Sequence, residues 1–182
     1  MKILQKICFF LLLSIFSSAN SGECFDVPDG FVSACLEDAK QGDANAQELM
    51  GLLYNYAGSE DEGILQDHKE AVKWFKLAAE QGLPIAQKYL GIKYSNGEGV
   101  LQDHKEAVKW FKLAAEQGDY EAQTYLGMKY SNGEGVLQDH KEAVKWFKLA
   151  AEQGLPIAQT YLGMKYSNGE GVLQDHKEAV KW

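Results

Sequence analysis

Apolar residues recur along this chain with a helical spacing, inside a unit that itself returns at a fixed distance. In residues 103–118, Ala107, Phe111, Ala114 and Ala115 recur at helical spacing, while Lys105, Lys109 and Lys112 fall on the outer face. This spacing is typical of an amphipathic helix that buries one stripe. The segment is therefore predicted to be a helix packed against a neighbouring element.

Capping residues mark both ends of this predicted helix. Asp103 precedes it and Glu106 follows three residues later, which is a capping-box arrangement. Gly118 stands where the helix ends and a left-handed residue is favoured. We expect Val100 and Leu101, just before the cap, to pack back onto the core.

A second helix is predicted before each copy of the first. It starts at a first-turn proline such as Pro84 or a capping aspartate such as Asp119, and it stops in the turn-forming residues 95–99. Its apolar face is formed by Ala86, Leu90 and Tyr94. Gly91 lies beside this face and removes a side chain where two helices must approach closely. Each unit is thus a helix–turn–helix.

The units are nearly identical. The stretch LQDHKEAVKWFKLAAEQG occurs unchanged at 65–82, 101–118 and 137–154, and a fourth copy begins at 173. A fixed period of this kind is typical of a solenoid, in which each unit contacts mainly its neighbours. The predicted boundaries of the units are 43–82, 83–118, 119–154 and a shortened 155–182, preceded by a capping half-repeat at 22–42 in which Cys35 stands where Phe75 stands in the next unit. Four extra residues in the first unit fall in an acidic loop at 58–63.

The first 21 residues have the order of a signal peptide. Lys2 and Lys6 are followed by a short apolar run at 7–16 and then by small residues, with cleavage predicted after Ala19 or Ser21. The run is too short to span a bilayer, although a membrane-anchored N-terminus is the alternative. We expect export, to a bacterial periplasm or the medium; the lumen of the endoplasmic reticulum is also compatible with such a peptide.

Two cysteines remain after the leader is removed. Cys24 and Cys35 form a close, even pair in an exported chain, so a disulfide is predicted, and a metal-binding pair is the alternative. The chain carries a formal net charge of −8, and its 18 basic residues are all lysine. An acidic surface without arginine argues against nucleic acid as a partner.

The repeated residues resemble the Sel1-like repeat family, a branch of the tetratricopeptide-like solenoids. The shared pattern is Ala-Gln-x-x-Leu-Gly-x-x-Tyr, then Gly-x-Gly-Val-x-x-Asp, then Ala-x-x-x-Phe-x-x-Ala-Ala-x-x-Gly, and it runs here from Ala86 to Gly118. The resemblance covers residues 30–182. It implies an all-α, right-handed α-solenoid of antiparallel helix pairs that binds a protein or peptide on its concave surface.

The copies differ mainly along one stripe of the first helix of each unit. Five positions change between copies: 83 and 84, which belong to the start of the helix, and 85, 88 and 92, which form one stripe of it. The resemblance places this stripe on the concave groove; free drift of exposed positions is the alternative. The candidate partner-binding residues are Asn45, Glu48, Leu52, Asn55, Ile85, Lys88, Ile92, Ser95, Glu121, Thr124, Met128, Ser131, Ile157, Thr160, Met164 and Ser167. On this assignment, Gly127→Leu should destabilise the fold, whereas Met128→Glu should spare it.

The residues of common catalytic and metal sites do not come together in this sequence. Ser-x-x-Lys, His-Glu-x-x-His and Gly-x-Ser-x-Gly are absent, and His68, His104, His140 and His176 are spaced too far apart to share a metal. We therefore predict no catalytic residue, no metal and no cofactor. A cell-wall-type hydrolase is the rival hypothesis, because a cysteine-rich branch of the family is linked to penicillin binding, but that branch has a cysteine pair in each repeat.

The resulting prediction is an exported, non-catalytic scaffold for a protein or peptide, without a membrane-spanning segment once the leader is removed. A repeat spacer with no specific ligand is a further alternative. The sequence stops at Trp182 within a predicted helix, so we expect further repeats to follow, the alternative being a frayed last helix.

Overall fold

The computed structural model describes residues 31–56 and 65–182, and in these ranges the protein is entirely helical. The predicted signal peptide, Cys24 and the predicted acidic loop at 58–63 lie outside the described residues. The helices are α2 (Phe31–Gln41), α3 (Ala44–Tyr56), α4 (His68–Glu80), α5 (Pro84–Asn96), α6 (His104–Glu116), α7 (Tyr120–Asn132), α8 (His140–Glu152), α9 (Pro156–Asn168) and α10 (His176–Ala179).

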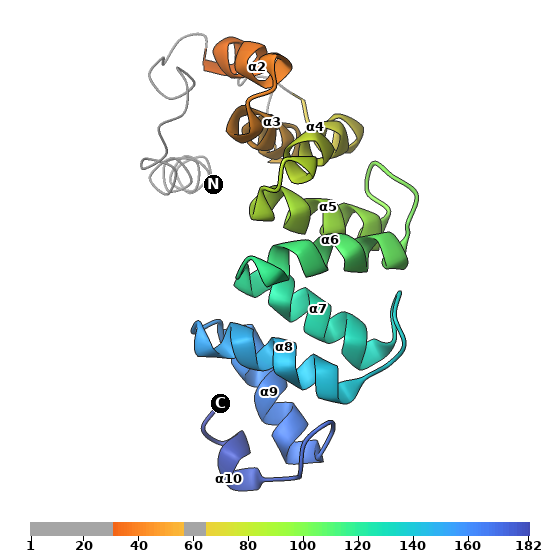
Figure 1. The fold of residues 1–182 in the computed structure, drawn as a ribbon, viewed down its shortest axis with the longest axis vertical. Coiled ribbons are helices and arrows are strands. Elements are labelled where there is room, and N and C mark those ends of the chain that lie inside the picture. The colour runs from red at the N-terminus through yellow and green to blue at the C-terminus, as the bar shows by residue number, and fades with distance from the viewer. Residues whose placement is uncertain (1–30, 57–64) are drawn as a thin grey trace.

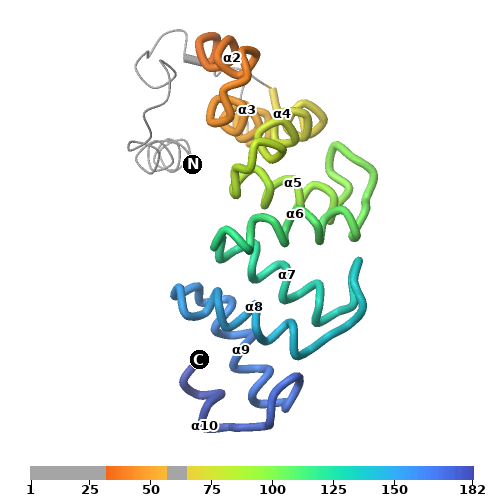
Figure 2. Tube along the Cα trace, in the orientation of Figure 1, coloured from red at the N-terminus to blue at the C-terminus, as the bar shows by residue number. Residues whose placement is uncertain are grey.

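Two kinds of helix alternate along an elongated stack (Figure 1). We call α3, α5, α7 and α9 the A helices, and α4, α6 and α8 the B helices. Each helix packs mainly on its neighbours in the chain, and the trace in Figure 2 descends from α2 to α10 without folding back. The molecule is therefore an α-solenoid of helix pairs, as the sequence predicts.

The B helices begin at the predicted aspartate cap. The Oδ1 atom of Asp103 accepts hydrogen bonds from the backbone N–H groups of Lys105 and Glu106, at 2.9 and 3.0 Å. The capping box is nevertheless incomplete, and that part of the prediction is wrong. The Asp103 N–H donates to the Tyr94 carbonyl oxygen at 2.9 Å, so Glu106 does not reach back and pairs with Lys109 instead.

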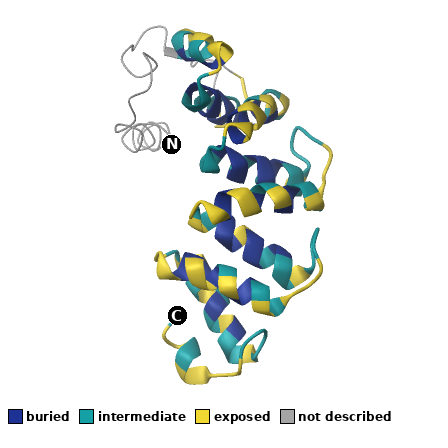
Figure 3. Cartoon of the chain, viewed as in Figure 1, coloured by how far each residue is buried: buried dark blue, intermediate teal, exposed yellow. Residues whose placement is uncertain are grey.

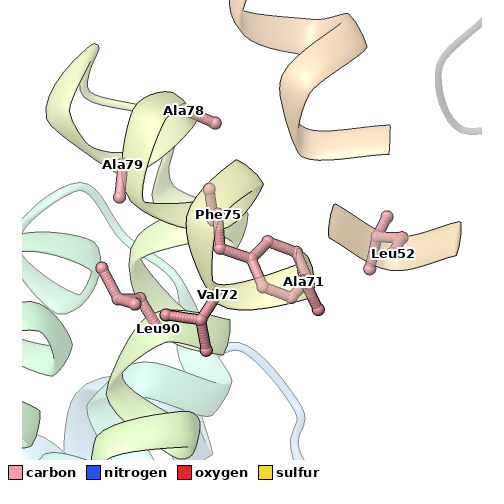
Figure 4. Packing of buried hydrophobic residues seen from close by; sticks show 8 residues of the cluster. Leu52, Ala71, Val72, Phe75, Ala78, Ala79 and Leu90 are labelled. Carbon is pink, nitrogen blue, oxygen red and sulfur yellow. The ribbon is translucent and has the colours of Figure 1, made fainter. Parts of the chain in front are cut away.

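Phenylalanine and glycine fit together where an A helix meets the following B helix. A Cβ atom built on Gly91 would lie 2.7 Å from the Phe111 ring, and one on Gly127 would lie 2.7 Å from the Phe147 ring. Figure 4 shows the preceding cluster, with Phe75 between Leu52 of α3 and Leu90 of α5. The close approach expected at the glycine of each unit is confirmed.

The loops after α5 and α7 run along one edge of the stack (Figure 1). Gly99 has a φ of 76°, and a Cβ there would lie 2.2 Å from the carbonyl oxygen of His68. Val100 packs partly against the core, but Leu101 is 91% exposed, so its predicted packing is wrong. The tight glycine turn presses the loop backbone onto α4 and leaves the next side chain in solvent.

The first described helix completes the core at the N-terminal end. Cys35 and Ala39 of α2 are buried against Ala46 and Met50 of α3, as a B-type helix before the first full unit would be. Cys35 thus occupies the predicted phenylalanine position. The pairing of Cys35 with Cys24 stays a prediction, because Cys24 lies outside the described residues.

Candidate functional site

The predicted partner-binding stripe lies where consecutive A helices face each other. In the first three A helices it is largely covered: Glu48, Leu52, Asn55, Lys88 and Thr124 are all buried. The remaining members on these helices are half-buried: Asn45, Ile85, Ile92, Ser95, Glu121, Met128 and Ser131. The sequence places this stripe away from the core, but the next repeat covers much of it.

The same stripe is open on α9. Ile157 and Met164 are 50% and 54% exposed, Thr160 is exposed and Ser167 is half-buried. By contrast, Ile92 and Met128 pack against the clusters of the following repeats. Figure 3 shows the inner helices darker than the C-terminal end of the stack. Met128→Glu is thus a poorer test of binding than a change on α9.

A buried carboxyl group links the first two A helices. The Glu48 Oε2 atom accepts a hydrogen bond from the Ala86 N–H, at 3.0 Å, in the first turn of α5. Burial raises the pKa of Glu48 to about 7, although the Ala86 N–H and the charge of Lys88 act in the opposite direction. Glu48 is 2% exposed, so its role in the free protein is to hold one repeat on the next.

This burial predicts a specific pH dependence. Between pH 4.5 and about 7, the unfolded chain ionises Glu48 while the folded chain keeps its proton, so stability present at low pH is lost as the pH rises. Relative to Glu48→Gln, the wild type should lose up to about 3 kcal/mol across this window. Urea unfolding of both proteins at a series of pH values measures the difference; parallel curves would contradict the assignment.

The second junction between A helices is built from opposite charges. Lys88 forms ion pairs with Glu121 and, at 3.9 Å, with Asp119, both contributed by the start of α7. Burial works to lower the pKa of Lys88, but the hydrogen bond to Glu121 and the charge of Asp119 outweigh it, so the pKa is raised. Lys88 stays charged and ties α5 to α7.

One tyrosine of each of the helices α5, α7 and α9 stacks on a phenylalanine, and these tyrosines were not singled out from the sequence. Tyr89, Tyr125 and Tyr161 stack on the phenylalanine of the preceding B helix at ring distances of 5.0–5.1 Å. Tyr125 is nevertheless 36% exposed. The signal that could have found it is its position, three residues before Met128 and four after Glu121, at the border of the variable stripe.

The repeated histidines contact a buried lysine. The Lys93 Nζ atom lies 3.0 Å from His68 Nδ1 and 2.7 Å from a Glu98 carboxylate oxygen. The equivalent contacts recur at Lys129 and Lys165. The hydrogen bond from Lys93 lowers the pKa of Glu98. This trio joins the loop after each A helix to the start of the previous B helix, and it was not expected from the sequence.

Within the described ranges, no three metal-ligating side chains come together. A cavity of about 150 Å³ opens between α7 and α9, lined by Glu121, Thr124, Tyr125, Met128, Leu155 and Ile157. The arrangement offers apolar and aromatic surface with few polar groups. The cavity's volume is below the range of pockets for small molecules, so it has room for a side chain rather than for a whole ligand.

These features define the class of the protein, an α-solenoid whose repeats stack through buried charges and present a half-open A-helix face. The chain belongs to the Sel1 repeat family: the family model matches residues 44–83, 84–119, 121–155 and 156–182. Sel1 repeats commonly act as protein-interaction modules and are generally non-catalytic.

Solved structures with the same fold come from several bacteria. The protective antigen c5321 of uropathogenic Escherichia coli, which displays an SLR fold, is 42% identical with a TM-score of 0.78, over 83% of this chain and 32% of that one. A Sel1 repeat protein from Oxalobacter formigenes is 36% identical with a TM-score of 0.77, over 84% of this chain and 59% of that one. This chain thus spans about a third and about three-fifths of these proteins.

A more distant likeness shows the fold alone. Helicobacter pylori cysteine rich protein B aligns with a TM-score of 0.52 at 21% identity, over 77% of this chain and 97% of that one. No curated protein matches the sequence. The described part of the chain holds no helix long and apolar enough to cross a membrane.

Proposed function

We propose that this protein is a non-catalytic scaffold that binds a peptide or protein segment along its A-helix face. The observation that carries the proposal is the contrast between the two helical surfaces. The A helices vary between copies; they expose Tyr125 and Ile157 at a cavity and Met164 further along α9. The B helices repeat one sequence, and their outer faces are covered by lysine–glutamate pairs such as Lys109–Glu106.

The A-helix face is also the side on which neighbouring repeats bond to one another through side chains. Tyr56 and Tyr89 hydroxyls lie 3.2 Å apart, and Lys165 donates to the Ser131 hydroxyl at 2.6 Å. We infer that this side is the inner, concave surface of the solenoid. A concave face lets an extended ligand contact several repeats at once, as solenoid binding surfaces commonly do.

A binding measurement with one matched pair of variants tests the proposal. Peptides are selected from a random display library on the purified protein, and their affinity is measured by calorimetry. Met164→Glu, on the A-helix face, should weaken binding about tenfold or more, whereas Leu149→Glu, on α8 and similarly exposed at 45%, should leave it unchanged. Peptides that depend on Leu149 but not on Met164 would contradict the proposal.

We also propose that the scaffold is exported, periplasmic or secreted. Support comes from the charged, apolar and small-residue order of positions 1–21 and from the bacterial origin of similar structures. The mature protein should begin at Asn20 or Gly22. N-terminal sequencing of the protein from a fractionated bacterial host measures this, and an intact Met1 in the cytoplasmic fraction would contradict export.

A further inference from the structure

At an equivalent position in the first turn of each A helix, an alanine N–H has no hydrogen-bond acceptor within the helix. This amide belongs to Ala46, Ala86, Ala122 or Ala158. Asp43 accepts from Ala46 at 2.7 Å, and Asp119 accepts from Ala122 at 2.7 Å. A carboxylate from the helix's own cap therefore serves α3 and α7.

Helices α5 and α9 lack such a cap and begin with one shared sequence. Both start with Leu-Pro-Ile-Ala-Gln, and neither Leu83 nor Leu155 supplies a side-chain acceptor. For α5 the acceptor comes from another helix: the carboxyl group of Glu48, on the preceding A helix, accepts the hydrogen bond of the Ala86 N–H. Among the described residues, no side chain accepts from the Ala158 N–H of α9.

Whether α5 or α9 receives such an acceptor depends on the residue at one position of the preceding A helix. Glu48, Lys88 and Thr124 are equivalent in the three A helices that precede another, and each lies beside the start of the following A helix, a place that we call the slot. Glu48 fills the first slot, and Lys88 fills the second through Asp119 and Glu121. Thr124 is short, and its hydroxyl bonds to the Tyr120 carbonyl oxygen at 2.9 Å.

The third slot is consequently hollow. The cavity of about 150 Å³ lies here, with Thr124 on one wall and Leu155 and Ile157, from the start of α9, on the other. Tyr125 and Met128 complete an apolar lining. The negative charge of Glu121, at the edge, is neutralised by its ion pair with Lys88. By the equivalence of the repeats, the cavity beside Thr124 corresponds to the place of the Glu48 side chain in the first slot.

We propose that the third slot binds a glutamate side chain of an extended partner peptide, whose carboxylate bonds to the first-turn amides of α9. Glu48 is the internal precedent, because it places a carboxyl group on the N–H of an identical helix start. The positive end of the α9 dipole favours the same charge. This inference rests on the proposed function and assigns the chemistry of one subsite within it.

Defined tripeptides test the slot directly. We titrate N-acetyl-Ala-Glu-Ala-amide into labelled protein and follow the Ala158 amide by NMR, up to about 5 mM, which detects a Kd of about 1 mM. The glutamate peptide should shift this amide with saturation, and the glutamine analogue should not. Equal shifts with both, no shift with either, or an equal shift with a peptide whose only carboxylate is its C-terminus would each overturn the proposal.

A variant that fills the slot from within provides the second arm. Thr124→Glu should abolish the tripeptide shift and, at about pH 5, where a carboxyl buried like Glu48 keeps its proton, raise Tm by about 2–4 °C, as a new helix cap would. Thr160→Glu, at the equivalent exposed position of α9, adds the same charge outside the slot and should do neither. Tripeptide binding that survives Thr124→Glu would overturn the assignment. If the protein forms a concentration-dependent dimer that Thr124→Glu dissociates, the slot binds a second copy of this chain. That result would also overturn the assignment.

The two proposals fail in different ways. If display-selected peptides depend on Met164 while the glutamate tripeptide leaves Ala158 unmoved, the slot is rejected and the scaffold stands. If the tripeptide binds as described while no selected peptide depends on Met164, the slot is supported and the wider A-helix face is rejected.

Discussion

Replacing Phe111 with alanine is expected to lower the free energy of unfolding by about 3–5 kcal/mol. The side chain is 1% exposed and fills the space that Gly91 leaves on α5, while Tyr125 of α7 stacks on its other side at 5.0 Å. Its removal opens a cavity shared by three helices and two repeats. Gly91 has no side chain that could move into that cavity.

Chemical denaturation followed by circular dichroism measures this loss. Leu113→Ala is the matched control, because Leu113 lies on the same helix but is 43% exposed, and it should change stability by no more than about 0.5 kcal/mol. Equal effects of the two changes would mean that the Phe–Gly contact does not hold the two helices of a repeat together.

A second large loss of stability is expected from Gly135→Ala. Gly135 has a φ of 76°, and a Cβ there would lie 2.2 Å from the His104 carbonyl oxygen. The left-handed conformation costs an alanine about 1–2 kcal/mol, and the backbone overlap adds about 1–3 kcal/mol. The loop must move off α6, so the contact between Lys129 and His104 should be disturbed as well.

Gly118→Ala separates these two contributions. Gly118 also has a positive φ, of 95°, but nothing lies within 4 Å of a Cβ built there. Gly118→Ala should therefore lower the free energy of unfolding only by the cost of the left-handed conformation, about 1–2 kcal/mol. The difference between the two variants, from denaturant unfolding, reports the crowding against α6; no difference would show that this loop does not press on the helix.

The helix pairs could be predicted from the sequence because they depend on local signals. Asp103, Gly97 and Gly118 fix where helices start and stop, and the spacing around Phe111 fixes which face is buried. All of these act within a few residues, so the periodic pattern contains them. The extended stack follows from the repeat itself.

Features that depend on how one repeat rests on the next were not predictable in the same way. Glu48 and Thr124 looked exposed on a helical wheel, yet the following A helix covers both. Likewise, the lysine–histidine contacts join residues 25 positions apart through a loop that folds back. Leu101 is solvent-exposed for a related reason, since the loop geometry outweighs its hydrophobicity.

The central claim is that the A-helix face binds a peptide, and hydrogen exchange tests it most directly. A display-selected peptide is added in excess, and amide protection is compared with that of the free protein. The account predicts added protection in α7 and α9, around Tyr125 and the start of α9, with α6 and α8 unchanged on their outer faces. Protection confined to the B helices or to the loops around Leu101 and Leu137 would contradict it.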